Sequence, residues 1–142
     1  MRFLLDTCVL SELVKPQPHA GVLAWIGVKN ESDFFISAMT LAELQRGIVK
    51  LPQSRRRQDL SLWLGKLQLN FGKRVLPFTD NTASYWADMC SRAEARGKTM
   101  AAFDSIIAAT ALEHGLELVT RNVRDFASAP VILVNPWDQQ TW

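Results

Sequence analysis

The sequence has few of the residues that mark exported, membrane-bound or disulfide-linked proteins. It contains two cysteines, Cys8 and Cys90, and no apolar run close to the ~20 residues of a membrane-spanning helix. One arginine and a short apolar run precede Asp6, which is not the pattern of a secretory signal peptide. We therefore expect reduced thiols, a cytoplasmic location and no membrane partner.

Catalytic groups other than carboxylates are also scarce. The two histidines, His19 and His114, are far apart, and neither lies beside a serine or cysteine in a recognisable nucleophile setting. The cysteine and histidine spacing of a zinc site is missing. The Gly-Lys-Thr fragment at 97–99 is not a phosphate-binding P-loop, because Arg92 occupies a position that requires glycine. The acidic residues remain as the candidates for chemistry.

Neither sign of charge dominates the chain, whose formal net charge is +2 over 142 residues. With 48% hydrophobic and 21% charged residues, this length predicts one globular domain, residues 1–142. One segment, 50–74, concentrates basic residues and contains a single acid, Asp59. Such a segment suits either phosphate binding or a solvated helix face. Its basic residues are Lys50, Arg55, Arg56, Arg57, Lys66, Lys73 and Arg74.

Short apolar runs alternate with segments of helical periodicity along the chain. Runs of this length suit buried strands, and their alternation with helices is typical of βαβ units. The pattern predicts a three-layer α/β sandwich with a central, mainly parallel sheet of four to five strands. We expect strands at 3–5, 33–37, 75–78, 116–120 and 131–134, and helices at 9–13, 22–26, 40–48, 58–71, 79–97 and 104–115.

Polar oxygen-bearing side chains recur at the ends of these predicted elements. Asp6 ends the first strand, Glu43 lies near the start of the helix after the second, and Asp104 opens a later helix; Asn122 and Asp125 follow the fourth strand. The carboxyl ends of parallel strands share one edge of a sheet, so these side chains can meet there. Clustered carboxylates repel unless a cation is present, and their hard oxygens suit Mg²⁺ or Mn²⁺. Metal-assisted phosphodiester hydrolysis is the chemistry that follows.

Each acid also has a purely structural interpretation. Asp6 can cap the helix that follows it. Thr40 and Glu43 have the spacing of a capping box, in which the glutamate reaches back to the N–H of the cap residue. Asp104 can likewise serve only as a helix cap. Convergence of the acids at one place would favour the metal site.

Four motifs follow one another along nearly the whole chain. They are Leu-Leu-Asp-Thr-x-Val-x-Ser-Glu-Leu at 4–13, Ser-Ala-x-Thr-x-Ala-Glu-Leu-x-x-Gly at 37–47, Asp-x-x-Ile-Ala-Ala-x-Ala at 104–111 and Thr-Arg-Asn-x-x-Asp-Phe at 120–126. In this order they resemble the motifs of the PIN-domain ribonucleases. Within these, the chain is similar to the VapC-type toxins of toxin–antitoxin modules, including the FitB-like branch with its Asn-Pro-Trp ending.

The resemblance implies a site and a cofactor, Mg²⁺ with Mn²⁺ as a possible substitute. Asp6 and Asp104 would be the main metal ligands, and Glu43 would complete the acidic cluster directly or through water. The fourth position of the family, often Asp, falls on Asn122 here, and Asp125 could supply charge nearby.

Cys8 is a further departure, since the family commonly has asparagine at this position. We expect it to affect local packing or hydrogen bonding around the site more than metal binding.

We also predict contacts to substrate phosphates, because an acidic groove alone repels RNA. Arginines beside the groove and hydroxyls at the strand ends are the candidates. They are Thr7, Arg46, Arg55, Arg56, Arg57 and Thr120.

The resemblance further implies an Mg²⁺-dependent endoribonuclease that acts as a toxin, dimerises, is neutralised by an antitoxin protein and meets operator DNA only through that antitoxin. A PIN nuclease of RNA processing and a DNA-binding toxin–antitoxin complex are the near alternatives. A receiver-like signalling domain also gathers acids around Mg²⁺. It needs paired acids after its first strand and a lysine after its last, yet Asp6 is unpaired and the last run ends in Val-Asn-Pro at 134–136.

Apolar residues in the segment 60–86 predict an interface, with Trp63, Leu67 and Trp86 prominent. We expect part of this surface to form a two-fold dimer. A separate groove is predicted to receive the antitoxin, beside Leu13, Trp25 and Leu44.

Overall fold

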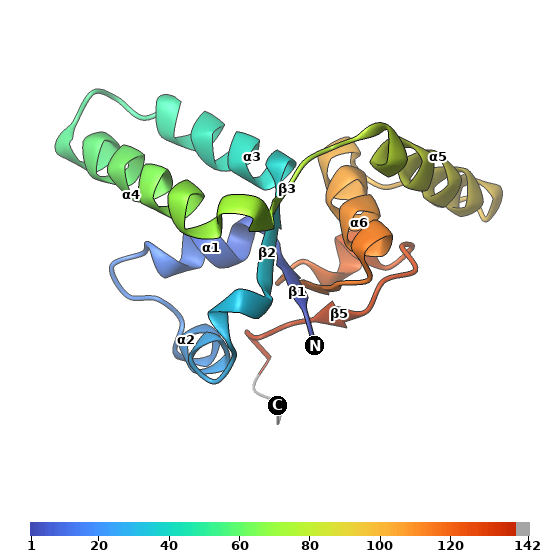
Figure 1. Ribbon diagram of the computed structural model, residues 1–142, viewed down its shortest axis with the longest axis horizontal. Coiled ribbons are helices and arrows are strands. Elements are labelled where there is room, and N and C mark those ends of the chain that lie inside the picture. Colours follow the sequence, from blue (N-terminus) through green and yellow to red (C-terminus); the bar gives the residue numbers. More distant parts are fainter. Residues whose placement is uncertain (139–142) are drawn as a thin grey trace.

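A five-stranded parallel sheet forms the centre of the computed structural model, which describes residues 1–138 (Figure 1). The strand order is β3-β2-β1-β4-β5, so the first strand of the chain lies in the middle of the sheet. This arrangement confirms the predicted mainly parallel α/β sandwich. The strands are β1 Phe3–Leu5, β2 Phe34–Ser37, β3 Val75–Leu76, β4 Glu117–Val119 and β5 Leu133–Val134.

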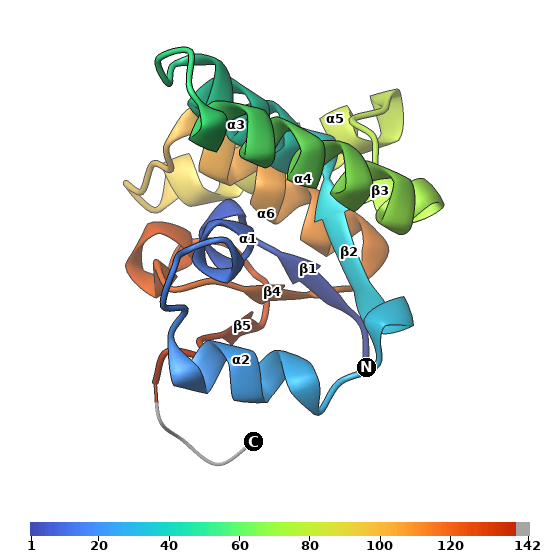
Figure 2. The ribbon, with the colours of Figure 1, turned by 90° about the vertical axis from the view of Figure 1, so that its left-hand side faces the viewer.

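Helices cover both faces of the sheet (Figure 2). The first four pack on one side, and the last two pack on the other (Figure 1). The α-helices are α1 Thr7–Leu13, α2 Ala20–Gly27, α3 Ala38–Val49, α4 Arg55–Phe71, α5 Asp80–Ala95 and α6 Ala102–His114, and three short 3₁₀ turns are η1 Glu31–Asp33, η2 Gly72–Arg74 and η3 Val123–Phe126. In the described part of the chain, no helix is long and apolar enough to cross a membrane.

The side chains of β1 alternate between two separate hydrophobic cores. Phe3 and Leu5 join the core under α1, α2 and α4, whereas Leu4 joins the core under α5 and α6. This alternation is the period of two that a strand imposes. All three residues are buried, which explains why the first strand is a continuous apolar run.

Trp25 belongs to the first core rather than to a groove. Its ring packs edge-on against Phe3 at 5.0 Å and stacks on Phe34 at 5.8 Å between centroids. Trp25 is 1% exposed and Leu44 is 7% exposed. The predicted antitoxin groove beside Leu13, Trp25 and Leu44 is therefore wrong, because two of its three residues fill the core. The periodicity of α2 identified a buried face but not what covers it.

The helix ends show where local sequence rules held and where they did not. Ser37 caps α3, since its Oγ accepts the N–H of Thr40 at 3.1 Å. The capping box predicted for Thr40 and Glu43 is therefore wrong; α3 begins three residues earlier, which places Glu43 beyond the first turn. Gly115 ends α6 in the left-handed conformation, with φ of 64°, as the sequence predicted.

Two further boundaries differ from the prediction. The helix α4 begins at Arg55 instead of residue 58, because Ser54 accepts the N–H of Arg57 at 3.2 Å and caps it. The strand β3 ends at Leu76, before Pro77, which has no N–H to continue a ladder. The predicted cap of α5 at Thr79 is confirmed.

The carboxyl ends of β1, β2 and β4 lie side by side because these strands are parallel neighbours. Leu5 pairs with Val119, and the backbone N–H of Asp6 donates to the carbonyl of Val119 at 2.9 Å. The residues that follow β1 and β4 therefore meet at one edge, which is where ligands bind in open α/β sheets.

Candidate functional site

Asp6 is the central carboxylate of this edge, and two partners fix its orientation. Its Oδ1 accepts the backbone N–H of Thr7 at 2.8 Å. Its Oδ2 accepts the hydroxyl of Thr120 at 2.7 Å. Asp6 is only 5% exposed, yet its carboxylate has about four acceptor sites, more than these two bonds use. Asp6 thus caps α1 and also presents a held carboxylate at the edge.

Glu43 reaches the same edge from α3. Its Oε1 accepts the hydroxyl of Thr7 at 2.6 Å, and that hydroxyl lies 3.3 Å from Oγ1 of Thr40. A single residue of the first motif thus holds two acids, since the N–H of Thr7 binds Asp6 and its hydroxyl binds Glu43. Ser37 and the buried Thr40 complete a hydroxyl chain beneath the site.

Asp104 lies in the first turn of α6, where the negative charges of the other acids act on its carboxyl group. Burial raises the pKa of Asp104, and the negative charges of Asp6, Asp125 and Glu43, in that order of size, raise it further, to about 6. The cap position of α6 is Ala101, which makes no side-chain cap bond. The charges of Asp6, Asp125 and Glu43 therefore act on Asp104, whereas the metal-binding roles expected of these four residues stay a prediction.

The acids share an edge without closing on a single point. Among residues 1–138, no group of three or more His, Cys, Asp or Glu side chains is close enough to hold one ion as it stands. The expectation that Asp6, Glu43 and Asp104 meet within a few ångströms of a common point is therefore wrong for this structure, in which Glu43 is bound to the Thr7 hydroxyl.

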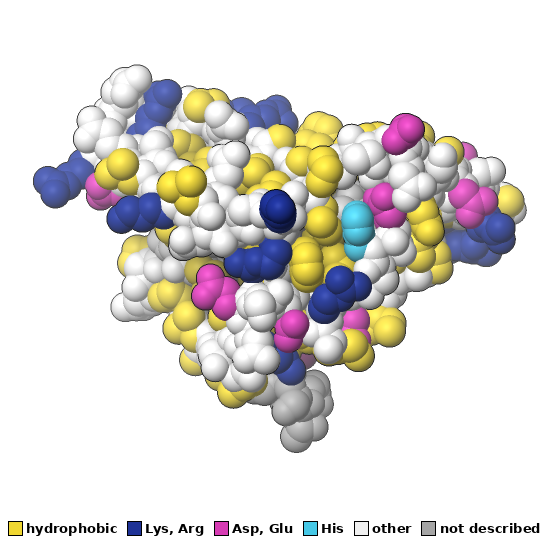
Figure 3. Space-filling model, viewed as in Figure 1, with side chains coloured by type: hydrophobic (Ala, Val, Ile, Leu, Met, Phe, Trp, Pro, Cys, Tyr) yellow, Lys and Arg dark blue, Asp and Glu magenta, His cyan; other side chains and the backbone are white. Residues whose placement is uncertain are grey.

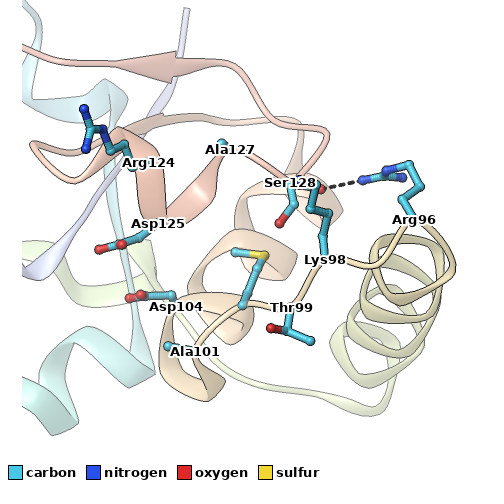
Figure 4. Close-up of a pocket in the computed structure, with 10 residues that line it drawn as sticks. Arg96, Lys98, Thr99, Ala101, Asp104, Arg124, Asp125, Ala127 and Ser128 are labelled. Carbon is cyan, nitrogen blue, oxygen red and sulfur yellow. Dashed lines mark hydrogen bonds between the residues drawn. The ribbon is translucent and has the colours of Figure 1, made fainter.

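Asp125, rather than Asn122, supplies one of the three negative charges that act on Asp104. Asp125 belongs to η3 and Asn122 is the cap residue before it; the backbone N–H of Asn122 donates to Oγ1 of Thr120 at 3.0 Å. The carboxylates of Asp104 and Asp125 extend in the same direction (Figure 4). In this structure Asn122 shapes the loop through its backbone, and Asp125 adds the negative charge.

Cys8 contacts the site through its thiol, as expected from its position. The Sγ donates to Oδ2 of Asp6 at 3.5 Å, lies 3.6 Å from Oγ1 of Thr120 and accepts the N–H of Arg121 at 3.5 Å. Burial and the adjacent Asp6 charge raise the pKa of the Cys8 thiol to about 11. Cys8 is therefore a neutral thiol at physiological pH. Both cysteines of the chain are free.

The residues expected to contact phosphate are dispersed. The hydroxyls of Thr7 and Thr120 already donate to carboxylates of the site. Arg57 donates to the carbonyl of Leu51 at 3.1 Å, which closes the turn between α3 and α4. The other arginines form no ion pair with the cluster in the described part of the chain. Arg46 is exposed three residues beyond Glu43, and Arg55 and Arg56 are exposed in the first turn of α4.

Basic residues from elsewhere lie closer to the acids than sequence reasoning indicated. A cavity of about 570 Å³ is lined by Asp104 and Asp125 together with Arg96, Lys98 and Arg124. These cations come from the α5–α6 connection and from η3. The only local signal in the sequence is the Gly-Lys-Thr fragment at 97–99, which lacks the pattern of a P-loop.

Comparisons with known proteins agree with this geometry. The family model described as "PIN domain" matches residues 3–131. The chain is 40% identical to toxin FitB of Neisseria gonorrhoeae over 135 residues, covering 94% of this chain and 97% of that protein. It is 38% identical to VapC ribonuclease Y4jK of Sinorhizobium fredii over 136 residues, covering 95% and 97% of the two proteins.

A solved structure has the same fold. The chain is similar to one in the structure of FitAB bound to an IR36 DNA fragment, with a TM-score of 0.92, 36% identity and 98% of each chain covered. The match spans the sheet, the helices on both faces and the edge that carries the acids. This chain is a member of the PIN-domain family, in the branch that contains FitB and the VapC ribonucleases.

Proposed function

We propose that residues 1–142 form a single-domain, divalent-metal-dependent endoribonuclease that acts as the toxin of a toxin–antitoxin pair. One observation carries the nuclease assignment. The negative charges of three carboxylates, Asp6, Asp125 and Glu43, act on a fourth, Asp104, at the carboxyl edge of the sheet. None of them forms an ion pair among residues 1–138. Negative charge crowded without a protein cation is the donor set of a metal site.

Mg²⁺ fits these donors, with Mn²⁺ as a substitute, because both prefer carboxylate oxygens and water. Asp6 and Asp104 would hold the ion directly, and Glu43 would hold it directly or through water. When bound, such an ion lowers the pKa of a coordinated water and stabilises negative charge on a phosphate. Divalent-metal dependence is typical of the PIN-domain nucleases to which the chain is related.

The chain's own residues orient the donors. The Thr120 hydroxyl and the Thr7 N–H fix the plane of the Asp6 carboxylate. The Thr7 hydroxyl donates to Glu43 and holds its carboxylate at the edge of the site. Asp125 adds charge beside Asp104. Partners that hold metal ligands in this way typically tune metal affinity and activity by about 10- to 100-fold.

The relatives support the biological role. One is named toxin FitB, another is named a VapC ribonuclease, and a similar chain is part of FitAB bound to DNA. By this likeness, the chain cleaves RNA, binds an antitoxin protein, meets operator DNA only through that antitoxin, dimerises and works in the cytoplasm. A PIN nuclease of RNA processing is the alternative, and no feature of the site favours it over the toxin.

The test of the nuclease is cleavage of a labelled single-stranded RNA by the purified chain. We expect cleavage with Mg²⁺, none with EDTA, and none by Asp6→Asn, whereas Asp59→Asn on the exposed surface of α4 remains active. Equal cleavage by Asp6→Asn and the unaltered chain would contradict the proposal.

The toxin role has its own test in cells. Induced expression should arrest growth, and co-expression of the cognate antitoxin should restore it. Cleavage in vitro without growth arrest would favour RNA processing instead.

A further inference from the structure

The cavity beside Asp104 is lined by both acidic and basic side chains. It has a volume of about 570 Å³, within the range of small-ligand sites. Asp104 and Asp125 lie at one end, and Lys98 and Arg96 lie at the other (Figure 4). Arg124 precedes Asp125 in η3 and also lines it. The cavity thus extends from an acidic end, where Arg124 flanks Asp125, to Lys98 and Arg96 at the opposite end.

The cations are positioned without being neutralised. Arg96 donates to the carbonyl of Ser128 at 3.0 Å and to that of Arg92 at 3.4 Å, so neutral partners hold its guanidinium in place. The backbone N–H of Lys98 donates to the carbonyl of Ala93 at 2.9 Å, which fixes the connection after α5. Within residues 1–138, none of Arg96, Lys98 and Arg124 forms an ion pair.

We propose that Lys98, together with Arg96 at the same end of the cavity, binds a backbone phosphate of the RNA next to the one at the acidic cluster. The inference rests on the proposed nuclease function and adds a second phosphate position to it. The carboxylate end would receive the phosphate that is cut. The cationic end would hold a neighbouring phosphate of the same strand and set the direction in which the strand crosses the site.

The lining favours a nucleic acid backbone over an acidic protein segment. Besides the charged groups, the cavity presents the hydroxyls of Thr99 and Ser128, which are common phosphate donors. A protein interface would add an apolar centre with aromatic side chains. Here the apolar lining is limited to Met100 and two alanines. Two successive phosphates of one strand would fit this arrangement. One would lie near a metal at the acidic end, and the other would lie near arginine and lysine at the cationic end.

The experiment compares two double variants with the same change of charge. Arg96→Gln/Lys98→Gln removes the proposed contacts. Lys66→Gln/Lys73→Gln is the control, since both lysines are exposed and Lys73 lies in the turn before β3, at the opposite edge of the sheet. Cleavage of a fluorophore–quencher RNA with Mg²⁺ gives kcat and KM for each, over a range of KCl concentrations.

We expect the cavity variant to raise KM by about tenfold with little change in kcat, because the two cations bind substrate and transition state alike. Its salt dependence should flatten by about 0.7 slope units for each phosphate that the variant no longer neutralises. The control should match the unaltered chain in both respects. Equal KM and salt slope for the two double variants would overturn the inference.

A binding experiment separates this inference from the nuclease assignment. Fluorescence anisotropy of labelled single-stranded RNA is measured in the Asp104→Asn background, where turnover is not needed for the readout. Adding Arg96→Gln/Lys98→Gln should weaken RNA binding by about tenfold, and adding the control pair should not. If the unaltered chain fails to cleave RNA but this difference persists, the nuclease proposal fails and the phosphate site stands. If the cavity pair alters binding of a short polyglutamate peptide but not of RNA, the cavity belongs to a protein partner and the inference fails.

Discussion

Thr120 and Asp6, which are 114 residues apart, are joined by a buried hydrogen bond of 2.7 Å from the threonine hydroxyl to Oδ2 of the aspartate. The bond exists because β1 and β4 are parallel neighbours whose ends coincide, with Leu5 paired to Val119. The same hydroxyl accepts the N–H of Asn122 at 3.0 Å. One side chain therefore connects the carboxylate of the first strand to the loop that carries Asp125.

Replacing Thr120 by valine tests this connection. The change keeps the shape but leaves Asp6 without its donor and the Asn122 N–H without its acceptor. We expect activity or metal affinity to fall by about 10- to 100-fold, with a loss of stability of about 1–3 kcal/mol. Thr120→Ser retains the hydroxyl and should keep most of both. Mg²⁺ titrations of the cleavage rate, with urea unfolding alongside, measure the two effects; a fully active Thr120→Val would show that the bond does not position Asp6.

Asp104 should destabilise the metal-free protein at neutral pH. Its pKa in the folded chain, about 6, lies above the ordinary value of 3.8, so the folded state binds the extra proton between these values. Stability therefore falls as pH rises from about 4 through 6. Asp104→Asn should then be more stable than the unaltered chain in EDTA at pH 7.5, by about 1 kcal/mol after allowing for solvent screening at a half-exposed carboxyl.

That difference in stability should disappear at about pH 4. At this pH Asp104 is largely protonated in the folded state, and at lower pH it becomes protonated in the unfolded state as well. Thermal melts across pH 4–8 make the comparison. Added Mg²⁺ should raise the melting temperature of the unaltered chain more than that of Asp104→Asn. A melting difference that does not depend on pH would show that the charge of Asp104 is not the cause.

Cys8 should resist alkylation although its side chain is only partly buried. Its pKa of about 11 leaves little thiolate at pH 8, and the thiolate is the reactive form. We expect iodoacetamide to modify Cys8 slowly at pH 8 in the native protein and readily after unfolding. Mass spectrometry of tryptic peptides follows the reaction. Fast native labelling at pH 8 would mean that the thiol is not held beside Asp6 as the structure has it.

The sequence is most informative where one short segment contains both the element and its chemistry. The run at 3–5 followed by Asp6 predicts a strand ending in an acid, and this is confirmed. The prediction that Asp104 lies at a helix start is also confirmed. In contrast, the capping box at Thr40 and Glu43 is wrong because Ser37, also a good cap residue, lies three positions earlier and begins the helix first.

Local sequence patterns do not predict which residues from distant segments meet across the sheet. The cavity combines Lys98, from the connection after α5, with Arg124, from the turn after β4, and only the packed fold brings these segments together. Tryptophans are frequent at interfaces, which favours an interface for Trp25, but aromatic partners from β1 and β2 enclose it. Similarly, the indole N–H of Trp86 donates to Ser105 within the chain at 2.8 Å.

The structure contains an apolar surface that suits the predicted dimer interface. An apolar cleft of about 260 Å³ between α3 and α6 is lined by Leu76, Phe78 and Ile106, and Phe78 is 48% exposed. Hydrophobic side chains gather on this face between α3–α4 and α5–α6 (Figure 3). This cleft contains residues 76 and 78 of the segment 60–86 that is predicted to dimerise.

We expect the isolated chain to be a dimer at micromolar concentration and Phe78→Glu to make it monomeric. Leu69→Glu on α4 is the control, because Leu69 is 83% exposed and lies outside this cleft. Light scattering coupled to size-exclusion chromatography gives the mass. A monomeric unaltered chain would contradict the dimer and leave the nuclease untouched.

The central claim is that the carboxylates at the edge of the sheet hold a divalent cation, and anomalous diffraction from crystals grown with Mn²⁺ tests it most directly. We predict one strong anomalous peak bonded to oxygens of both Asp6 and Asp104, at about 2.1 Å. The peak should vanish in Asp104→Asn crystals under the same conditions. The account would be contradicted if the same preparation cleaved RNA in the presence of Mn²⁺ while the crystals showed no anomalous peak at this edge, or showed the peak only elsewhere in the molecule.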